Sequence, residues 1–194
     1  MTERDKQLAG LGYNSLDEEL RTLQARAYNL TLKLNAVPAG NPAKKDRLVR
    51  KLFGSVGVNL TLCLPIHVDF GCNIFVGDNC LINMNCTFLD SNKIIIGDRV
   101  LIAPDVKIYT AGHPIEGEER SYDIGGGKTW NNVFAKPVKI GNDVWIGGGS
   151  VILPGITIGN NVVVGAGSVV THDIEDNSVA VGNPCRIIRK LNGD

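Results

Sequence analysis

Residues 138–170 read VKIGNDVWIGGGSVILPGITIGNNVVVGAGSVV, and every sixth residue of this stretch is aliphatic. The first series consists of Ile140, Ile146, Ile152, Ile158, Val164 and Val170. The second series lies two residues earlier and consists of Val138, Val144, Ser150, Ile156, Val162 and Ser168. A six-residue repeat predicts a parallel β-helix, in which three hexapeptides complete one turn and the aliphatic residues stack inside.

The same repeat extends toward the N-terminus with one irregularity. The first series continues through Val76, Ile82 and Phe88, shifts by two residues, and resumes at Ile96, Ile102 and Ile108. Cys80 and Cys86 occupy the second series, so we expect them to be small buried side chains. Gly, Asn and Asp recur at the expected corners, as in residues 77–79 and 159–161. These residue types tolerate positive φ, which sharp corners require.

The repeat is interrupted once, by the polar segment GHPIEGEERSYDIGGGKTWNNVFAKP at residues 112–137. A segment of this length without a repeat is uncommon inside a compact domain and is usually functional. The regular coils offer few places for chemistry, so the interruption is the expected location of an active site.

The remaining segments complete a mainly β fold with a helical N-terminus. Residues 1–57 are predicted to be helical, with a capping box of Ser15 and Glu18 opening a helix to about Leu34. A second helix is expected from Lys44 to Phe53. The β-helix then covers residues 58–184, with an excursion loop at 112–137. A basic tail at 185–194 follows, whose residues 186–190 are expected to form a strand or a short helix.

Bulk composition excludes several classes of protein. The 194 residues carry a formal net charge of zero, which favours neither nucleic acid nor a membrane surface as a partner. The sequence has neither the apolar run of a signal peptide nor one long enough to span a bilayer. Five cysteines without a CxxC pair indicate reduced thiols and a cytoplasmic location.

His113 is the candidate catalytic residue. It is one of three histidines and lies between Gly112 and Pro114, where the repeat gives way to the polar segment. Neutral imidazole accepts a proton near physiological pH, so a histidine here could be a general base. The alternative is an ordinary loop histidine.

Several motifs together resemble the maltose and galactoside O-acetyltransferase branch of the hexapeptide acyltransferases. The resemblance covers about residues 5–190, and its motifs are DFGCNIFVG (69–77), INMNCTFLD (82–90), IAPDV (102–106), GHP (112–114), NDVWIG (142–147), GAGSVVT (165–171) and GNPCR (182–186). It implies a left-handed β-helix, a homotrimer with active sites between neighbouring coils, and direct acetyl transfer from acetyl-CoA to a hydroxyl of a small acceptor, with no metal.

The resemblance also implies roles for individual residues. His113 would be the general base, and Asn83 and Asp69 would lie at the acceptor. Gly148 and Ala166 would follow the pantetheine arm of the cofactor, with Trp145 as a wall of the same cleft. Thr171 and His172 replace a Thr-Lys pair, and Arg186 and Arg189 match arginines near the phosphates. The simpler alternatives are a corner asparagine for Asn83, simple packing for Trp145 and a solvated basic tail for the two arginines.

Other functions remain open at this point. Galactoside-type members carry an acid and a basic residue on the N-terminal helix, where this chain has Ser15 and Gln24. The sugar acceptor therefore competes with an amine or antibiotic acceptor. A zinc hydratase would need three converging histidines, whereas His67 and His172 lie far from His113 in the repeat. A catalytically idle sugar-binding scaffold is the fourth possibility.

Overall fold

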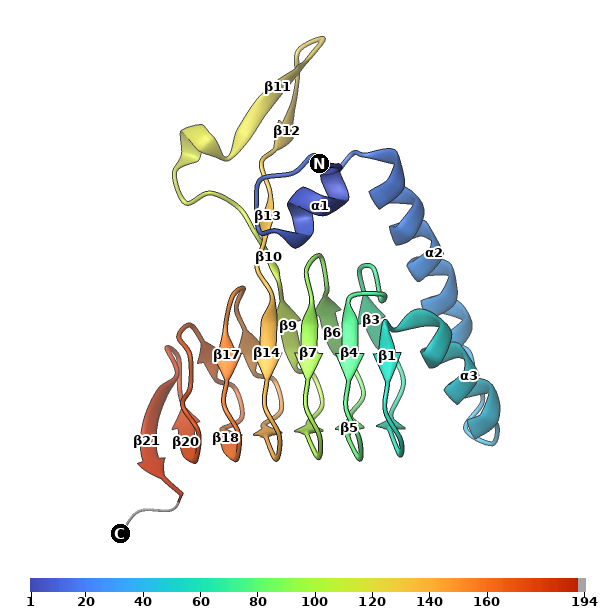
Figure 1. The fold of residues 1–194 in the computed structure, drawn as a ribbon, viewed down its shortest axis with the longest axis vertical. Coiled ribbons are helices and arrows are strands. Elements are labelled where there is room, and N and C mark those ends of the chain that lie inside the picture. Colours follow the sequence, from blue (N-terminus) through green and yellow to red (C-terminus); the bar gives the residue numbers. More distant parts are fainter. Residues whose placement is uncertain (192–194) are drawn as a thin grey trace.

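The computed structural model describes residues 1–191 and shows a prism built from three sheets, in which every strand except β21 runs parallel to its neighbours (Figure 1). The first sheet contains β1 (Ser55–Val56), β4 (Ile74–Val76), β7 (Ile94–Ile96), β14 (Val138–Ile140) and β17 (Thr157–Ile158). The second contains β2 (Thr61–Leu62), β5 (Leu81–Ile82), β8 (Leu101–Ile102), β15 (Trp145–Ile146), β18 (Val162–Val164), β20 (Ser178–Val181) and β21 (Arg186–Lys190). The third contains β3 (Ile66–Val68), β6 (Cys86–Leu89), β9 (Lys107–Tyr109), β16 (Val151–Ile152) and β19 (Val169–Val170).

The interior of the prism confirms the predicted β-helix and its register. Ile140 pairs with Ile158, and the other members of the first series pair in the same way, as Ile146 with Val164 and Ile152 with Val170. Both series are buried throughout, including Cys80 and Cys86. Each coil therefore covers the apolar edge of the coil before it, which is how short strands of two to four residues gain stability.

The corners explain the recurring glycines and Asx residues. A Cβ on Gly77, Gly97 or Gly141 would lie within 2.8 Å of a carbonyl carbon of the next coil, so only glycine fits. Asn79 and Asn161 have φ of 57° and 53°, as their positions at the corners predicted. The side chains beside these glycines form a ladder between coils, in which an Asx oxygen accepts a hydrogen bond from the backbone N–H of the preceding coil.

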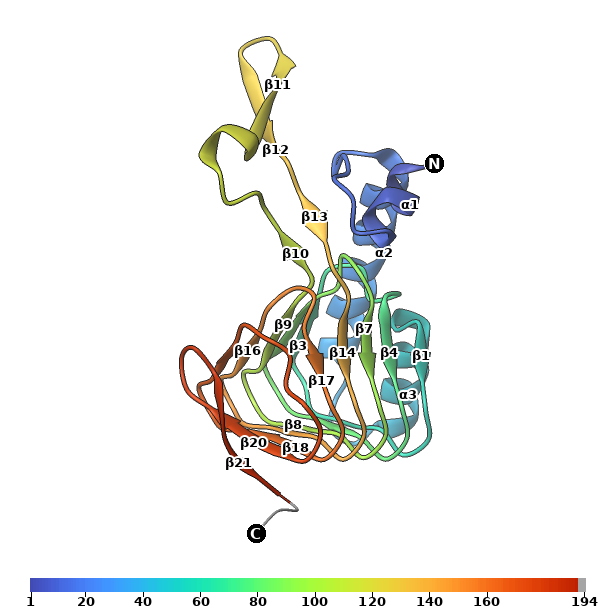
Figure 2. The ribbon, with the colours of Figure 1, turned by 60° about the vertical axis from the view of Figure 1, so that its left-hand side comes forward.

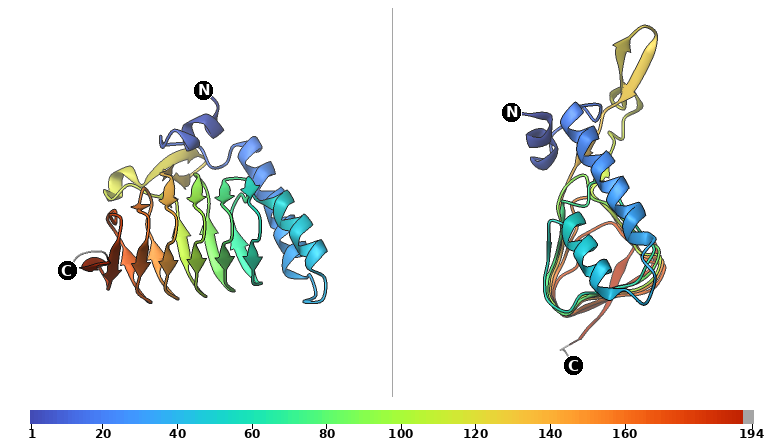
Figure 3. Two further views of the ribbon diagram at one scale, coloured as in Figure 1. Left: turned by 60° about the horizontal axis from the view of Figure 1, so that its bottom comes forward. Right: turned by 90° about the vertical axis from the view of Figure 1, so that its right-hand side faces the viewer.

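Three helices precede the prism: α1 (Glu3–Leu8), α2 (Glu18–Asn35) and α3 (Pro42–Leu52). The predicted capping box at Ser15 is wrong, because the N-cap of α2 is Asp17, whose carboxylate accepts hydrogen bonds from two backbone N–H groups of the first turn. Figure 3 shows α2 and α3 lying across the N-terminal end of the prism. Strand β1 begins at Ser55, slightly before residue 58, where we expected the β-helix to start.

The excursion predicted as a loop is a two-stranded arm that projects from the prism (Figure 2). Its base pairs β10 (Ala111–Gly112) with β13 (Phe134–Ala135), and its outer part pairs β11 (Ser121–Gly125) with β12 (Lys128–Asn131). The short 3₁₀ helix η1 (Gly117–Glu119) lies between β10 and β11. The tip, residues 125–127, consists of three glycines with positive φ, which allow the tight reversal.

Two corners of the prism carry candidate residues, and we name each corner by its contents. The arm edge joins the third sheet to the first and contains Asp69, residues 90–92 and the base of the arm. The Asn83 edge joins the second sheet to the third and contains residues 83–85, 103–105, 147–149 and 165–167. These assignments follow from the strand order in the three sheets.

The C-terminal end of the chain reverses direction. Strand β21 pairs antiparallel with β20, which confirms the strand alternative for residues 186–190. The last three residues of the predicted basic tail, 192–194, lie outside the described residues. Within residues 1–191, no helix has the length and apolar character needed to cross a bilayer.

Candidate functional site

His113 follows β10 directly, at the point where the arm leaves the prism. Its imidazole is exposed, and its Nδ1 lies 2.6 Å from the backbone oxygen of Asn132, between β12 and β13. A carbonyl oxygen only accepts hydrogen bonds, so Nδ1 carries the hydrogen and donates it. The other ring nitrogen, Nε2, then holds a lone pair and is able to accept a proton from a substrate.

The base of the arm is held by contacts with the N-terminal segment. The buried side chain of Asn92 donates hydrogen bonds to the backbone oxygens of Gln7 and Ala135, at 3.0 and 2.8 Å. Trp130 Nε1 donates to Ser15 Oγ at 2.8 Å. A small second core of Tyr13, Leu20, Phe70, Val133 and Ala135 packs beneath these bonds. The His113 ring is therefore exposed, but the backbone next to it is held in place by these hydrogen bonds and by this small core.

Asp69 lies on the same arm edge, in the turn between β3 and β4. Its Oδ1 accepts a hydrogen bond from Gln24 Nε2 at 2.8 Å, and its Oδ2 accepts one from Ser91 Oγ at 3.0 Å. Burial raises the pKa of this carboxyl, while the bonds from Gln24 and Ser91 oppose the rise. The carboxylate is thus already oriented by its neighbours.

The carboxyl of Asp90 is fully buried and accepts hydrogen bonds from the backbone at Asp69. This residue was not singled out from the sequence. Asp90 Oδ1 accepts hydrogen bonds from the backbone N–H groups of Asp69 and Phe70 at 3.0 and 2.8 Å. Burial raises the pKa of Asp90 to about 7, although the backbone bonds lower it. The two-residue shift between Phe88 and Ile96 was the available signal, because those extra residues widen this corner and hold Asp90, Ser91 and Asn92.

Asn83, Gly148 and Ala166 lie on the Asn83 edge; Gly148 and Ala166 are on successive coils, and the coil of residues 103–105 separates them from Asn83. Asn83 Oδ1 accepts a hydrogen bond from its neighbour's backbone N–H, at 2.9 Å, which is the geometry of a corner asparagine. Gly148 faces the backbone oxygen of Pro104, at 3.2 Å from where a Cβ would lie. Gly149 and Gly167 on the same edge have no atom within 4 Å of where a Cβ would lie, so the backbone there is open to close approach by a thin ligand.

Trp145 lies on the outer face of the second sheet, beside that edge. Its side chain is 53 % exposed, so core packing is not its role within one chain. It lies in register between Leu101, which is 47 % exposed, and Val163. These three side chains form a continuous apolar row that could wall a cleft.

The C-terminal candidates gather at the far end of the prism. Thr171 Oγ1 and His172 Nδ1 lie 2.8 Å apart, directly after β19. His172 and Arg186 line one cavity of about 310 Å³ together with Asp173, Ile174, Ala180, Cys185 and Ile187. Arg189 lies on β21 opposite Val179. The structure therefore brings His172 and Arg186 together at one cavity.

Within one chain, however, the candidates divide between two edges. His113, Asp69, Thr171 and His172 follow strands of the third sheet, whereas Asn83, Gly148 and Ala166 precede them. One side of the prism separates the two groups, and six extended residues span roughly 15–20 Å. That distance is too large for His113 and Asn83 of the same chain to contact one small substrate.

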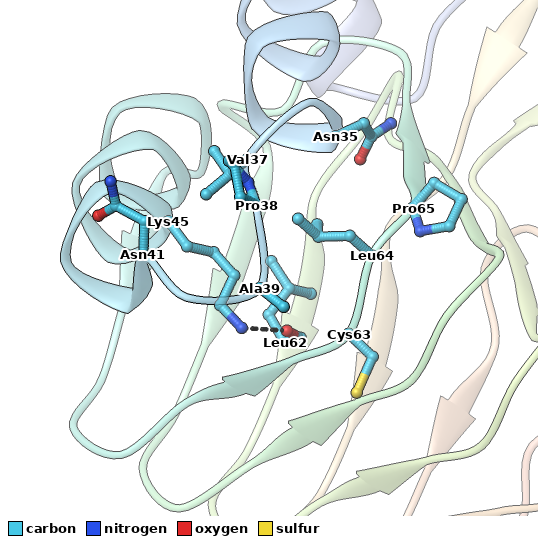
Figure 4. Close-up of a pocket in the computed structure, with 10 residues that line it drawn as sticks. All are labelled: Asn35, Val37, Pro38, Ala39, Asn41, Lys45, Leu62, Cys63, Leu64 and Pro65. Atoms are coloured by element: carbon cyan, nitrogen blue, oxygen red, sulfur yellow. Dashed lines mark hydrogen bonds between the residues drawn. The ribbon is translucent and has the colours of Figure 1, made fainter.

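Two further cavities lie beside these residues. One of about 420 Å³ adjoins His113 and is lined by Gly12, Pro114, Glu119, Asn132, Val133 and Phe134. Another, of about 430 Å³, lies at the N-terminal end of the Asn83 edge, between the turn from α2 to α3 and residues 62–65 (Figure 4). In it Lys45 Nζ donates to the Leu62 oxygen at 2.7 Å. In the part of the chain that the structure describes, no three His, Cys, Asp or Glu side chains converge as metal ligands would.

Comparison with known proteins identifies the family. Residues 6–57 match the maltose acetyltransferase hexapeptide capping motif, and residues 137–172 match the bacterial transferase hexapeptide repeat. The chain is 40 % identical to the galactoside O-acetyltransferase of Escherichia coli K12 over 192 residues, which cover 99 % of this chain and 90 % of that protein.

Two solved structures agree over the whole chain. The crystal structure of a maltose O-acetyltransferase from Clostridium difficile 630 matches with a TM-score of 0.92 and 48 % identity, covering 100 % of this chain and 99 % of that one. A hexapeptide-repeat acetyltransferase from Vibrio cholerae, complexed with acetyl coenzyme A, matches with a TM-score of 0.87 and 38 % identity, covering 100 % of both chains. The chain therefore belongs to the hexapeptide-repeat acetyltransferases, in the branch of the maltose and galactoside O-acetyltransferases.

Proposed function

We propose that the protein transfers an acetyl group from acetyl-CoA to a hydroxyl of a small acceptor, which we infer to be a sugar. The observation that carries this proposal is the bond from His113 Nδ1 to the Asn132 oxygen, which leaves Nε2 as an exposed base. The relatives named above act as acetyltransferases, and one of them was solved with acetyl-CoA bound.

In the proposed reaction His113 moves one proton in each direction. Its Nε2 takes the proton of the acceptor hydroxyl as the oxygen attacks the thioester carbonyl. The tetrahedral intermediate then collapses, the C–S bond breaks, and the imidazolium returns the proton to the departing CoA sulfur. The Nδ1–H bond to Asn132 stays in place throughout and stabilises the positive charge on the ring.

Three of the five cysteines are unsuited to form an acyl-enzyme, which is consistent with direct attack. Cys80, Cys86 and Cys185 are buried, and burial raises the pKa of each thiol, that of Cys86 to about 11. A thiol with a raised pKa is a poor nucleophile because the thiolate is the reactive form. All five cysteines are free, which also supports our proposal of a cytoplasmic location.

The division of the candidates between two edges supports a homotrimer with a site between subunits. In this arrangement the Asn83 edge of one subunit faces the arm edge of its neighbour, so that Asn83 and His113 contact one acceptor hydroxyl from opposite sides. Asp69 would contact other hydroxyls of that acceptor, since carboxylates accept hydrogen bonds from sugars.

Along the same cleft we place acetyl-CoA. Its pantetheine would follow Gly148 and Ala166 beside Trp145, next to the open backbone of Gly149 and Gly167. Its phosphates would lie near Thr171, His172, Arg186 and Arg189. Arginine forks suit phosphate oxygens, whereas a neutral histidine in place of a lysine contributes less charge.

The test measures turnover of acetyl-CoA with matched panels of sugars and amines. The readout is the release of the free CoA thiol. We expect acetylation of sugar hydroxyls. Turnover with amines alone would show an amine or antibiotic acceptor instead, and normal CoA binding without transfer to any acceptor would leave only a scaffold role. Sedimentation of the protein as a monomer at working concentration would contradict the shared site.

A further inference from the structure

The segment after His113 closes on itself through the side chain of Arg120. Arg120 Nε donates to the Pro114 oxygen at 3.2 Å, and its Nη2 donates to the Ile115 oxygen at 2.6 Å. These two carbonyls belong to the residues that immediately follow the histidine. The planar guanidinium presents its N–H groups in a rigid fork, so one side chain fixes the path of both peptides.

The backbone of Arg120 also reaches the opposite side of the arm, between β12 and β13. Its oxygen accepts a hydrogen bond from the backbone N–H of Asn132 at 2.9 Å. The side chain of Asn132 donates to the backbone oxygen of Glu119, the residue before Arg120. The position of Asn132 is therefore fixed by hydrogen bonds from its backbone N–H and from its side chain. The backbone oxygen of Asn132 is the group that accepts the hydrogen bond from His113 Nδ1.

These bonds form a closed ring through His113, Pro114, Arg120 and Asn132. An exposed imidazole can carry its hydrogen on either nitrogen, and only the tautomer with hydrogen on Nδ1 leaves Nε2 free as a base. The Asn132 oxygen selects that tautomer as long as it stays within hydrogen-bonding distance of the ring. Arg120 controls this distance from both ends, by its side chain and by its backbone.

We propose that Arg120 is a positioning residue that holds His113 in the Nδ1–H tautomer and aims its Nε2 into the cleft. This inference rests on the proposed function, in which His113 is the base. Arg120 itself does not touch the substrate. Its guanidinium is exposed, yet it donates to neutral backbone oxygens, so its contribution is the geometry of the loop and not a surface ion pair.

The experiment compares Arg120→Ala with wild type by long-range ¹H–¹⁵N NMR of the histidine rings, at a pH where the rings are neutral. The chain has three histidines, so the signals of His113 are assigned by its Ala variant. We expect the wild-type ring to show hydrogen on Nδ1 and the Arg120→Ala ring to shift toward hydrogen on Nε2. Kinetically, kcat should fall about 10- to 100-fold, because small misplacements of a catalytic group have effects of this order. The KM for acetyl-CoA should stay unchanged.

Two further measurements separate positioning from a loss of structure. Guanidinium ion added to Arg120→Ala should restore part of kcat and of the Nδ1–H signal, and Arg120→Lys, which keeps one donor, should be intermediate. The matched control is Lys128→Ala, which removes an exposed cation from β12 of the same arm. This variant should change neither kcat nor the Nδ1–H signal of His113.

An Arg120→Ala protein with an unchanged tautomer and unchanged kcat would overturn the inference. The alanine variant could lose the fold of the arm, which altered fluorescence of Trp130 would reveal. In that case Arg120→Lys is compared with wild type instead. An unchanged tautomer together with an unchanged kcat in Arg120→Lys would overturn the inference. A wild-type protein that transfers no acetyl group would instead refute the proposed function itself. The two failures are therefore distinguishable.

Discussion

Three consecutive glycines on the Asn83 edge should respond to alanine in three different ways. A Cβ on Gly147 would lie 2.8 Å from both the Cα of Ala166 and the carbonyl carbon of Gly165, which are backbone atoms of the next coil. A Cβ on Gly148 would meet the Pro104 oxygen at 3.2 Å, and one on Gly149 would meet no atom within 4 Å. Gly149, however, has φ of 69°, which an L-residue adopts at a cost.

These contacts set the expected magnitudes. Gly147→Ala should lower the free energy of unfolding by about 1–3 kcal/mol or more, because the neighbouring coil must shift as a unit to make room. Gly149→Ala should lower it by roughly 1–2 kcal/mol through backbone strain alone. Gly148→Ala should change stability by less than about 1 kcal/mol, since a contact of 3.2 Å needs only a small adjustment. The same methyl group would instead obstruct the proposed pantetheine path and raise the KM for acetyl-CoA.

The assay is denaturant unfolding of the three variants at one fixed protein concentration, because an oligomer's apparent stability depends on concentration. Steady-state kinetics with acetyl-CoA then separates Gly148→Ala from the other two. The reasoning is refuted if Gly148→Ala destabilises more than Gly147→Ala, or if its KM for acetyl-CoA equals that of wild type. The first result would show that the coil contacts are misassigned, and the second would move the pantetheine to another surface.

Four other predictions test the site and the coil. His113→Ala should lower kcat by roughly 10²–10⁴-fold with an unchanged melting temperature, because the ring is exposed; near-normal turnover would remove it from the mechanism. Ile146→Asp should prevent stable folding, since it places an unpaired charge at a fully buried position, and an unaltered melting curve would contradict the repeat register. Arg186→Ala should raise the KM for acetyl-CoA more than that for the acceptor, and the reverse pattern would refute the proposed division of the site. Burial raises the pKa of Asp90 to about 7, so the folded state holds this proton more tightly than the unfolded state; stability should fall as the pH rises from about 4 to about 7, and this slope should be smaller in Asp90→Asn when unfolding is measured across that range, because Asp69, whose pKa burial also raises, contributes the remainder.

The coil was the most predictable part of the molecule. Residues such as Ile140 and Ile158 must face inward in every turn, and a period of six leaves only one register that buries both series. The edge on which Asn83 or Gly148 lies also follows from counting hexapeptides around three sides. The predicted start of α2 at Ser15 was wrong, because Ser15 and Asp17 can both cap a helix and the sequence alone does not show which of them does.

The arm and the corner beneath it depended on contacts that sequence patterns do not encode. The pairing of β11 with β12 is short and polar, so it lacks the alternation by which strands are recognised. The bond from His113 to Asn132 joins residues 19 positions apart through a backbone oxygen, which has no residue type to detect. Asp90 was visible only as a change of period, and its partners come from the same corner of the preceding coil.

The reversal of the chain at β21 has a consequence for solubility. A stack of parallel coils ends in unpaired N–H and C=O groups, which would accept the coil of another molecule and lead to fibres. Strand β21 runs antiparallel to the strands of the stack and carries the exposed charges of Arg186, Arg189 and Lys190, so it hinders the second sheet from extending. Helices α2 and α3 close the opposite end. A chain shortened before residue 186 should accordingly remain folded along most of its length but aggregate end to end.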